Sequence, residues 1–203
     1  MALARSLIAL LLLAGCGDTP AAEAVRAAFA PTPVEEAEPV VQGPVLVLLA
    51  PRRATLLPVG GSGPRQLWRG PGGIAIATDG ARVVATAGLG QMLTATRVDG
   101  PDPLEDLRAT VAVPQSTRRT VDLSGADRDP ASMRFGLSFE CVVRARIEGE
   151  WLVAEERCGR NFEFFTNRYW ALPATGQVVR SEQWVGDAAG PVVVLHRDMR
   201  SFN

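Results

Sequence analysis

The sequence predicts a mostly β-sheet protein, built as one antiparallel, curved sheet of consecutive hairpins, half-barrel or sandwich-like, with a short N-terminal helix. Two observations lead to this fold class. Beyond Gly43 the chain breaks into short runs rich in β-branched residues, separated by Gly and Pro clusters such as Val59–Pro64, which is typical of antiparallel all-β domains. The same region sustains no helical period over three turns, and only Pro103–Thr110 is expected to form a short helix.

The first residues have the layout of a cleavable export signal. Arg5 precedes the apolar run Leu7–Leu13, which is far shorter than the roughly 20 residues that span a bilayer. The run ends in Leu-Ala-Gly-Cys at 13–16, which resembles the lipobox of bacterial lipoproteins. In a lipobox the cysteine thiol is acylated, with palmitate as a convenient label, and the chain is cut before it. We therefore predict a signal peptide at residues 1–15 and lipidation at Cys16, where several acyl chains would give a stable anchor.

Residues 16–43 are predicted to be the lipid anchor and a tether, and residues 44–203 the β-rich domain. The tether is rich in Pro, Ala and Glu, and its stretch Ala21–Ala30 is the predicted short helix. Gly17 follows the anchor cysteine where an acidic residue would signal retention in the inner membrane. This favours a cell-envelope protein that is lipid-anchored in the outer membrane and faces the periplasm.

The charge composition excludes one class of partner. Removing residues 1–15 leaves 203 − 15 = 188 residues with 20 arginines, no lysine and 22 acidic residues, a net charge of 20 − 22 = −2. A chain so close to neutrality has no electrostatic footprint for nucleic acid. The hydrophobic content of 47% also excludes a disordered polar chain. We expect a globular domain attached to a membrane through its lipid.

Two hairpin turns predict strand registers. If Asp79-Gly80 forms a two-residue turn, Thr78 faces Ala81 and Ile76 faces Val83, which gathers apolar residues on one face. If Gly149-Glu150 is a type II′ turn, every pair of facing residues has numbers that sum to 299. The facing pairs are then Ile147 with Leu152, Ala145 with Ala154, Arg144 with Glu155, and Cys141 with Cys158. The two cysteines would have Cα atoms about 4.5 Å apart, within the range of a disulfide bond, and we predict that they are bridged.

The C-terminal part of the chain concentrates aromatic residues. Strands Phe162–Ala171 and Gln177–Val185 flank a four-residue loop, and Pro191–Asp198 is predicted as the last strand. Sugar rings stack on exposed aromatic faces, so this hairpin is a candidate glycan or partner surface. Its candidate residues are Tyr169, Trp170 and Trp184. Because alternation places neighbouring residues on opposite faces, some of the rings must be core or covered, and this is the preferred interpretation.

The sequence offers no catalytic, cofactor-binding or metal-binding set. His196 is the only histidine, so a multi-histidine metal site cannot form, and no Gly-x-Ser-x-Gly elbow accompanies it. The two cysteines of the hairpin are not spaced as Cys-x-x-Cys, which suits a structural bridge better than redox chemistry. A pair of carboxylates for glycoside hydrolysis is not excluded, because any two acidic residues can meet in the folded chain; Asp187 and Asp198 are examples that no feature of the sequence favours. We expect no cofactor.

The stretch Asn167–Trp184 carries a resemblance to a known family. Its aromatic pair, Thr-Gly turn, Val and Ser-x-Gln are similar to the closing hairpin of the YjbF-type, group 4 capsule polysaccharide lipoprotein family. The similarity extends to the hairpin Ile76–Val84, to Asp102-Pro103-Leu104 and to the lipobox; the cysteine pair is not part of the pattern. The resemblance implies a link to making or exporting capsular or secreted polysaccharide, beside an outer-membrane β-barrel or other polysaccharide-export partner. It supplies no molecular activity.

Three functions follow as hypotheses, in order of preference. The first is a non-enzymatic outer-membrane lipoprotein, accessory to capsule or exopolysaccharide assembly or export, acting through contacts with proteins or with the polysaccharide. The second is a periplasmic carrier or chaperone that holds a lipid or acyl chain in a curved sheet, which a wide dry pocket would favour. The third is a glycan-processing enzyme, which needs two carboxylates about 5 to 9.5 Å apart in a cleft.

Overall fold

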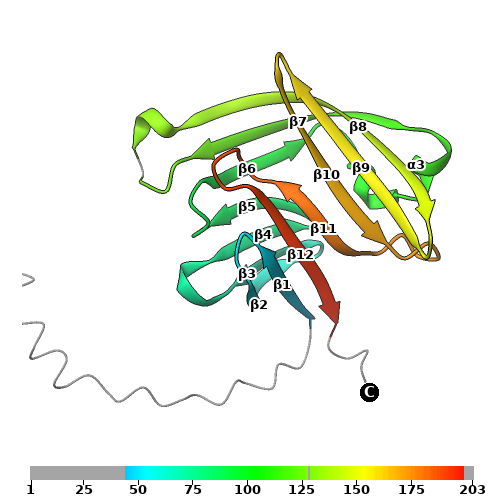
Figure 1. The fold of residues 1–203 in the computed structure, drawn as a ribbon, viewed down its shortest axis with the longest axis horizontal. Helices are drawn as coiled ribbons and strands as arrows, with labels where there is room; N and C mark the ends of the chain where they lie inside the picture. Colours follow the sequence, from blue (N-terminus) through cyan, green and yellow to red (C-terminus); the bar gives the residue numbers. More distant parts are fainter. Residues whose placement is uncertain (1–43, 128, 199–203) are drawn as a thin grey trace, which may run out of the picture. The chain divides into compact units, whose positions relative to one another are not determined.

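The computed structural model describes residues 44–127 and 129–198 of the 203-residue chain. The predicted signal peptide, Cys16, and the predicted tether with its helix lie outside the described residues. The described part forms one sheet of twelve antiparallel strands (Figure 1). The strands are β1 (Pro44–Ala50), β2 (Ala54–Ser62), β3 (Arg65–Arg69), β4 (Ala75–Asp79), β5 (Arg82–Ala87), β6 (Met92–Val98), β7 (Gln115–Ser124), β8 (Arg134–Glu148), β9 (Trp151–Arg160), β10 (Glu163–Ala171), β11 (Val178–Trp184) and β12 (Pro191–Asp198).

The curved antiparallel sheet of consecutive hairpins confirms the predicted fold class, and it curls further than a half-barrel, into a nearly closed barrel. Its strand order is β5-β4-β3-β2-β1-β12-β11-β10-β9-β8-β7-β6, so the first and last strands pair and the two edges are β5 and β6. These edges lie side by side, and the Leu93 amide donates a hydrogen bond to Thr86 Oγ1 at 3.0 Å. We call this line between β5 and β6 the seam.

The helical segments described by the structure are short. They are the 3-10 turns η1 (Pro71–Gly73), η2 (Pro103–Asp106) and η3 (Pro130–Ser132), and the helix α3 (Ala109–Ala112). The segment predicted to be helical therefore forms η2 and α3. Asp102 caps η2 by accepting a hydrogen bond from the Leu104 amide, and Pro103 occupies the first turn. Among residues 44–127 and 129–198, no helix is long and apolar enough to cross a membrane.

The Gly and Pro cluster Val59–Pro64, predicted to separate two strands, is part of the β2–β3 hairpin, where Gly61 pairs with Gln66. A Cβ at Gly61 would collide with the Arg65 carbonyl oxygen, so glycine is needed for the close approach of the two strands. The interpretation as loop is wrong because glycine here serves strand packing.

The β8–β9 hairpin confirms the predicted register. All its pairs sum to 299, and Gly149 at the first turn position has a φ of 59°, as a type II′ turn requires. Cys141 and Cys158 face each other with Cα atoms 4.0 Å apart and are joined by a disulfide bond. The predicted facing of Ile147 with Leu152 also holds, although Ile147 is exposed beside the turn.

The predicted register of the β4–β5 hairpin is wrong. The two central residues are Gly80 and Ala81, so Asp79 pairs with Arg82 and Thr78 with Val83. With Gly80 first, its φ of 55° is the only positive φ in the turn. The predicted Asp-Gly pair would require a positive φ at the aspartate as well. Placing glycine first removes that requirement.

Two apolar clusters fill the interior of the barrel. The larger includes residues of β1, β2 and β4 and reaches Phe139 and the disulfide, whereas the smaller surrounds Tyr169 with residues of β8, β9 and β10. Interior positions also carry buried polar and charged side chains. They include Arg82, Arg119, Glu156, Asn167, Ser181 and Gln183.

Candidate functional site

A buried ion network begins at the edge strand β5. Arg82 contacts two carboxylates through both sides of its guanidinium group. Toward Asp102, its Nε and Nη2 donate at 2.6 and 2.8 Å, and toward Glu156 on β9 its Nη1 and Nη2 donate at 3.0 and 2.9 Å. Arg82 is 1% exposed and Glu156 0%. Bidentate contacts of this kind fix the direction of a guanidinium group as well as its charge.

Glu156 collects further partners from β7 and β10. The Asn167 side-chain amide donates to its Oε2 at 2.6 Å, and Arg119 Nη1 lies 3.5 Å from the same oxygen. Burial opposes ionisation of Glu156, but Arg82 and Arg119 outweigh it and lower the pKa to about 2. For Arg119 burial prevails and lowers its pKa, whereas Arg82, although equally desolvated, has its pKa raised by Glu156 and Asp102.

Gln183 on β11 joins the network to the edge strand. Its Oε1 accepts from the Val83 amide at 2.9 Å and from the Tyr169 hydroxyl at 3.3 Å. Its side-chain amide donates to the Ala81 carbonyl at 2.8 Å and to Ser181 Oγ at 2.9 Å. Backbone groups of an unpaired edge are thereby satisfied by a side chain from across the interior.

The network opens to solvent at the seam. A pocket of about 490 Å³, here called the seam pocket, is lined by Arg82, Thr96 and Asp102. Thr96 Oγ1 accepts a hydrogen bond from Arg119 Nε at 2.8 Å, which connects the pocket to the innermost arginine. Other charged residues also line the pocket. They are Arg65, Asp79, Arg97, Asp99 and Glu105.

Sequence motifs that lie far apart in the chain meet at this network. Arg82 comes from the hairpin Ile76–Val84, and Asp102 from Asp102-Pro103-Leu104. The closing hairpin contributes its aromatic pair through Tyr169 and its Ser-x-Gln through Gln183. Arg82, Asp102, Tyr169 and Gln183, which belong to the stretches that carry the resemblance, therefore lie in one network that links the seam edge to the opposite wall of the barrel.

The family model of the group 4 capsule polysaccharide lipoproteins gfcB and YjbF matches residues 34–194. The chain belongs to this family. Among solved structures, the crystal structure of the hypothetical lipoprotein YmcC from Escherichia coli (K12) is similar, with a TM-score of 0.56 and 20% sequence identity. The match covers 76% of this chain and 82% of that one. No curated protein matches the chain.

The structure separates the three predicted surface aromatics. Tyr169 is 0% exposed inside the barrel, and its hydroxyl lies 3.5 Å from Glu156 Oε2, so it cannot belong to a surface. Burial, reinforced by the charge of Glu156, raises the pKa of Tyr169. Trp170 lies on the outer face of β10 beside Arg168 and Arg180. Tyr169 is therefore not part of the candidate surface, and the preferred interpretation, that alternation makes some of these rings core, is confirmed for this residue.

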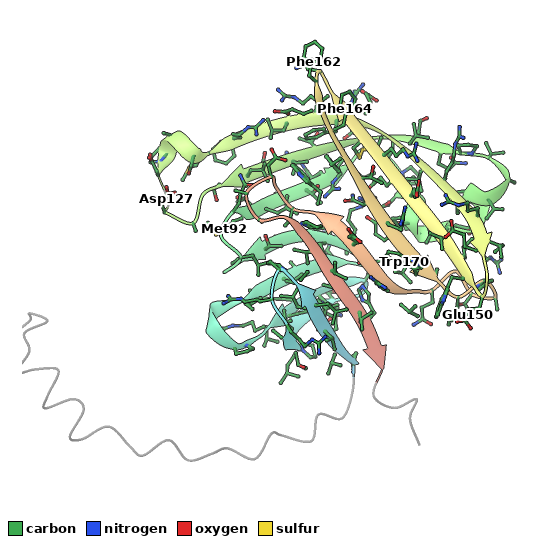
Figure 2. All side chains as sticks on the ribbon, viewed as in Figure 1. Met92, Asp127, Glu150, Phe162, Phe164 and Trp170 are labelled. Carbon is green, nitrogen blue, oxygen red and sulfur yellow. A yellow bond between two sulfur atoms is a disulfide. The ribbon has the colours of Figure 1, made fainter. Side chains whose placement is uncertain are left out.

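Trp184 lies in a different place, at the end of the barrel near the β9–β10 turn. Its ring stacks on Phe165 at 4.2 Å between centroids, and its indole N–H donates to Asp187 Oδ1 at 2.9 Å. It lines a pocket of about 260 Å³ together with Phe162 and Phe164. Figure 2 shows both phenylalanines at the tip of the hairpin, far from Trp170.

The buried charged residues escaped the sequence analysis although a signal for them exists. Glu156 shares the strand parity of Ala154 and Cys158, which the predicted register places on the core face. Arg119 likewise points to the same face of its strand as the buried Val121, two residues later. A charged residue at an inward position indicates a buried ion pair, because an unpaired buried charge is too costly.

The interior charged groups are held in place by ion pairs and hydrogen bonds. Glu156 remains ionised at neutral pH and has no solvent exposure. One oxygen of Glu156 and the sulfurs of Cys141 and Cys158 lie within 4.8 Å of one another, but the disulfide removes the thiolates that a metal ion would need. Burial lowers the pKa of His196 to about 4, so its ring is neutral at physiological pH.

Proposed function

We propose that this chain is a non-enzymatic lipoprotein, accessory to the assembly or export of capsular or extracellular polysaccharide. It would be anchored through Cys16 in the outer membrane and face the periplasm, after removal of residues 1–15. Its partners would be polysaccharide-export proteins, such as an outer-membrane β-barrel, and the polysaccharide itself. The observation that carries the proposal is the family match over residues 34–194, whose motifs converge on one network in the barrel.

The filled interior supports this function over a lipid carrier. A carrier needs a wide apolar hollow, whereas this barrel is occupied by two apolar clusters and an ion network. The larger pocket is lined by charged and polar side chains at the seam. Acyl chains gain little in such a site, because they cannot pair with its polar groups.

The seam pocket is the place where an enzyme hypothesis can be tested. Asp79, Asp99, Asp102 and Glu105 line it, and glycoside hydrolysis uses two carboxylates. Asp102 is paired with Arg82 and Asp79 with Arg65, so Asp99 and Glu105 are the two to change. We expect Asp99→Asn with Glu105→Gln to leave polysaccharide production unchanged at normal protein level. Loss of production would revive the enzyme hypothesis.

The central test is deletion of the gene in a producing strain, followed by complementation. We expect deletion to abolish or strongly reduce surface polysaccharide and the wild-type gene to restore it. Cys16→Ser should restore it poorly, and labelling with palmitate should mark only the wild-type protein. Unchanged polysaccharide after deletion would overturn the proposed function, and palmitate labelling of the Cys16→Ser protein would overturn the anchor.

A further inference from the structure

The outer face of β8 to β11 carries arginines in ordered rows. Strand register aligns facing residues across the sheet, with neighbouring strands about 4.8 Å apart. One row contains Arg144, Glu155, Arg168 and Glu182, and the next contains Arg146, Val153, Trp170 and Arg180. Arg157, two residues after Glu155 on β9, extends the group by one row. We call the five arginines with Trp170 the arginine face.

One carboxylate serves three of these arginines. Glu155 contacts Arg168 at 2.7 Å, Arg157 at 2.9 Å and Arg146 at 3.5 Å. The hydrogen bond from Arg168 lowers the pKa of Glu155 most. Burial raises this pKa, but Arg157 and Arg146 lower it further, and the result is a pKa of about 2, so Glu155 is ionised at neutral pH. Arg146 also pairs with Glu148.

The arginine face keeps an excess of positive charge. Its five arginines are opposed by three glutamates, Glu148, Glu155 and Glu182, which leaves two positive charges. The whole chain has a net charge of −1, so this face departs from the average of the molecule. The side chains of Arg146, Arg157 and Arg168 are 52%, 75% and 46% exposed, and their donors are within reach of a ligand.

Trp170 organises two of the guanidinium groups. Arg180 lies over its ring at 4.5 Å and Arg168 at 5.9 Å. A guanidinium group stacked on an aromatic ring keeps the N–H donors at its edge free, in a geometry that matches a carboxylate. Within residues 44–127 and 129–198, Arg180 and Arg144 make no ion pair.

We propose that the arginine face binds an acidic glycan, a chain of sugar rings that carry carboxylate groups. This inference rests on the proposed function and names the chemistry of its polysaccharide. Rows of arginines along four strands offer repeated charge-assisted hydrogen bonds to a polymer with repeated carboxylates. Trp170 adds an apolar surface beside them, on which a sugar ring can lie.

The position of the exposed aromatics argues against a membrane as the occupant. Insertion into a lipid surface needs apolar side chains next to the basic ones. The most exposed phenylalanine, Phe162, lies eight residues before Trp170, about 26 Å along an extended strand. Figure 2 shows the two at opposite ends of β10. Nearer the arginine face, Val142, Ile147 and Leu172 are 40%, 58% and 38% exposed, so the experiment below includes a lipid vesicle as a competing occupant.

Binding can be measured with the full-length lipoprotein in detergent micelles. The probes are polygalacturonate and dextran of matched length, an acidic and a neutral glycan. We expect polygalacturonate to bind, with an affinity that falls as salt rises, and dextran not to bind. Arg168→Gln with Arg180→Gln should weaken binding at least tenfold. The matched control, Arg53→Gln with Arg69→Gln, removes the same charge from exposed positions outside the arginine face and should change affinity less than twofold.

Several outcomes would overturn the inference. These are no binding of polygalacturonate, equal binding of dextran, equal loss in the Arg53→Gln, Arg69→Gln control, or binding only to vesicles of phosphatidylglycerol. The same double variant is then placed in the deletion strain. If deletion removes the polysaccharide but the variant neither loses binding nor lowers production, the inference fails and the proposed function stands. If deletion changes nothing, the proposed function fails by itself.

Discussion

Glu155 and Glu156 are consecutive residues of β9, yet they belong to different faces of the sheet. Each is held by arginines, and both have a pKa of about 2. Glu156 points into the barrel, where Arg82, Arg119 and the carboxylate itself are at most 1% exposed. Glu155 points outward, and although its own side chain is 9% exposed, the arginines that hold it are about half exposed or more.

The comparison teaches that the same ion pair has different uses on the two faces. Inside, each charge has lost its water, so removing one partner leaves another charge buried and unpaired. Outside, water and salt replace a lost partner at little cost. The inner arginines therefore hold the seam edge to the far wall, whereas the outer arginines are free to exchange a glutamate for a ligand.

The largest effect is expected from removing the inner carboxylate. Glu156→Gln leaves Arg82 and Arg119 without their shared counter-charge, and we expect a loss of about 3–5 kcal/mol in the free energy of unfolding. Urea unfolding followed by tryptophan fluorescence measures it, with Glu155→Gln as the matched control one residue away. A loss below about 1 kcal/mol would break the comparison, because the buried network would then not support the fold.

Removing the disulfide should have the next largest effect. Cys141 and Cys158 are separated by 17 residues, for which loop-closure entropy gives about 3 kcal/mol as an upper value. The hairpin already brings the strands together, so we expect a smaller loss for Cys141→Ala with Cys158→Ala. Denaturant unfolding measures the loss. Mass spectrometry of a non-reducing digest must first show the joined peptides, and two free thiols in envelope-purified protein would contradict the bridge.

Local turn chemistry explains which parts of the fold the sequence could predict. The β8–β9 register follows from Gly149, because one glycine at the first turn position fixes every later pair down to the cysteines. The register predicted for β4–β5 is wrong because Asp79-Gly80 and Gly80-Ala81 both satisfy the sequence pattern of a two-residue hairpin turn. Only the positive φ at Gly80, with none at its neighbours, separates them.

The network could not be predicted because it depends on long-range placement. Arg82 meets Glu156 across 74 residues, and Gln183 meets Ala81 across 102. Sequence parity could have placed Glu156 on the core face, but not chosen its partners. Tyr169 and Trp170 show the same limit, because an aromatic pair must split between the two faces, and only the register decides which one is exposed.

A third prediction concerns the inward position of His196. Burial lowers its pKa from 6.5 to about 4, so the unfolded chain binds a proton more readily than the folded one between these values. Stability from this group is therefore complete above pH 6.5 and lost as the pH falls toward 4, by at most about 3 kcal/mol. Urea unfolding at several pH values from 4 to 7 should show that the free energy of unfolding rises more steeply with pH for the wild type than for His196→Gln. Equal slopes would place the ring in solvent.

The smallest effect on stability, and the sharpest contrast, is expected from Glu155→Gln. Its arginine partners are solvated, so the loss should be within about 1 kcal/mol and shrink further at high salt. The pKa of Glu155 is lowered, so this contribution is present above pH 4.5 and disappears as the pH falls toward 2.

The substitution Glu155→Gln also frees Arg157 and Arg168 and removes one negative charge from the outer face, so polygalacturonate should bind more tightly. Parallel titrations and unfolding curves of Glu155→Gln and Glu156→Gln measure both properties. Weaker binding by the Glu155→Gln protein at unchanged stability would mean that the carboxylate, and not the arginines around it, contacts the glycan.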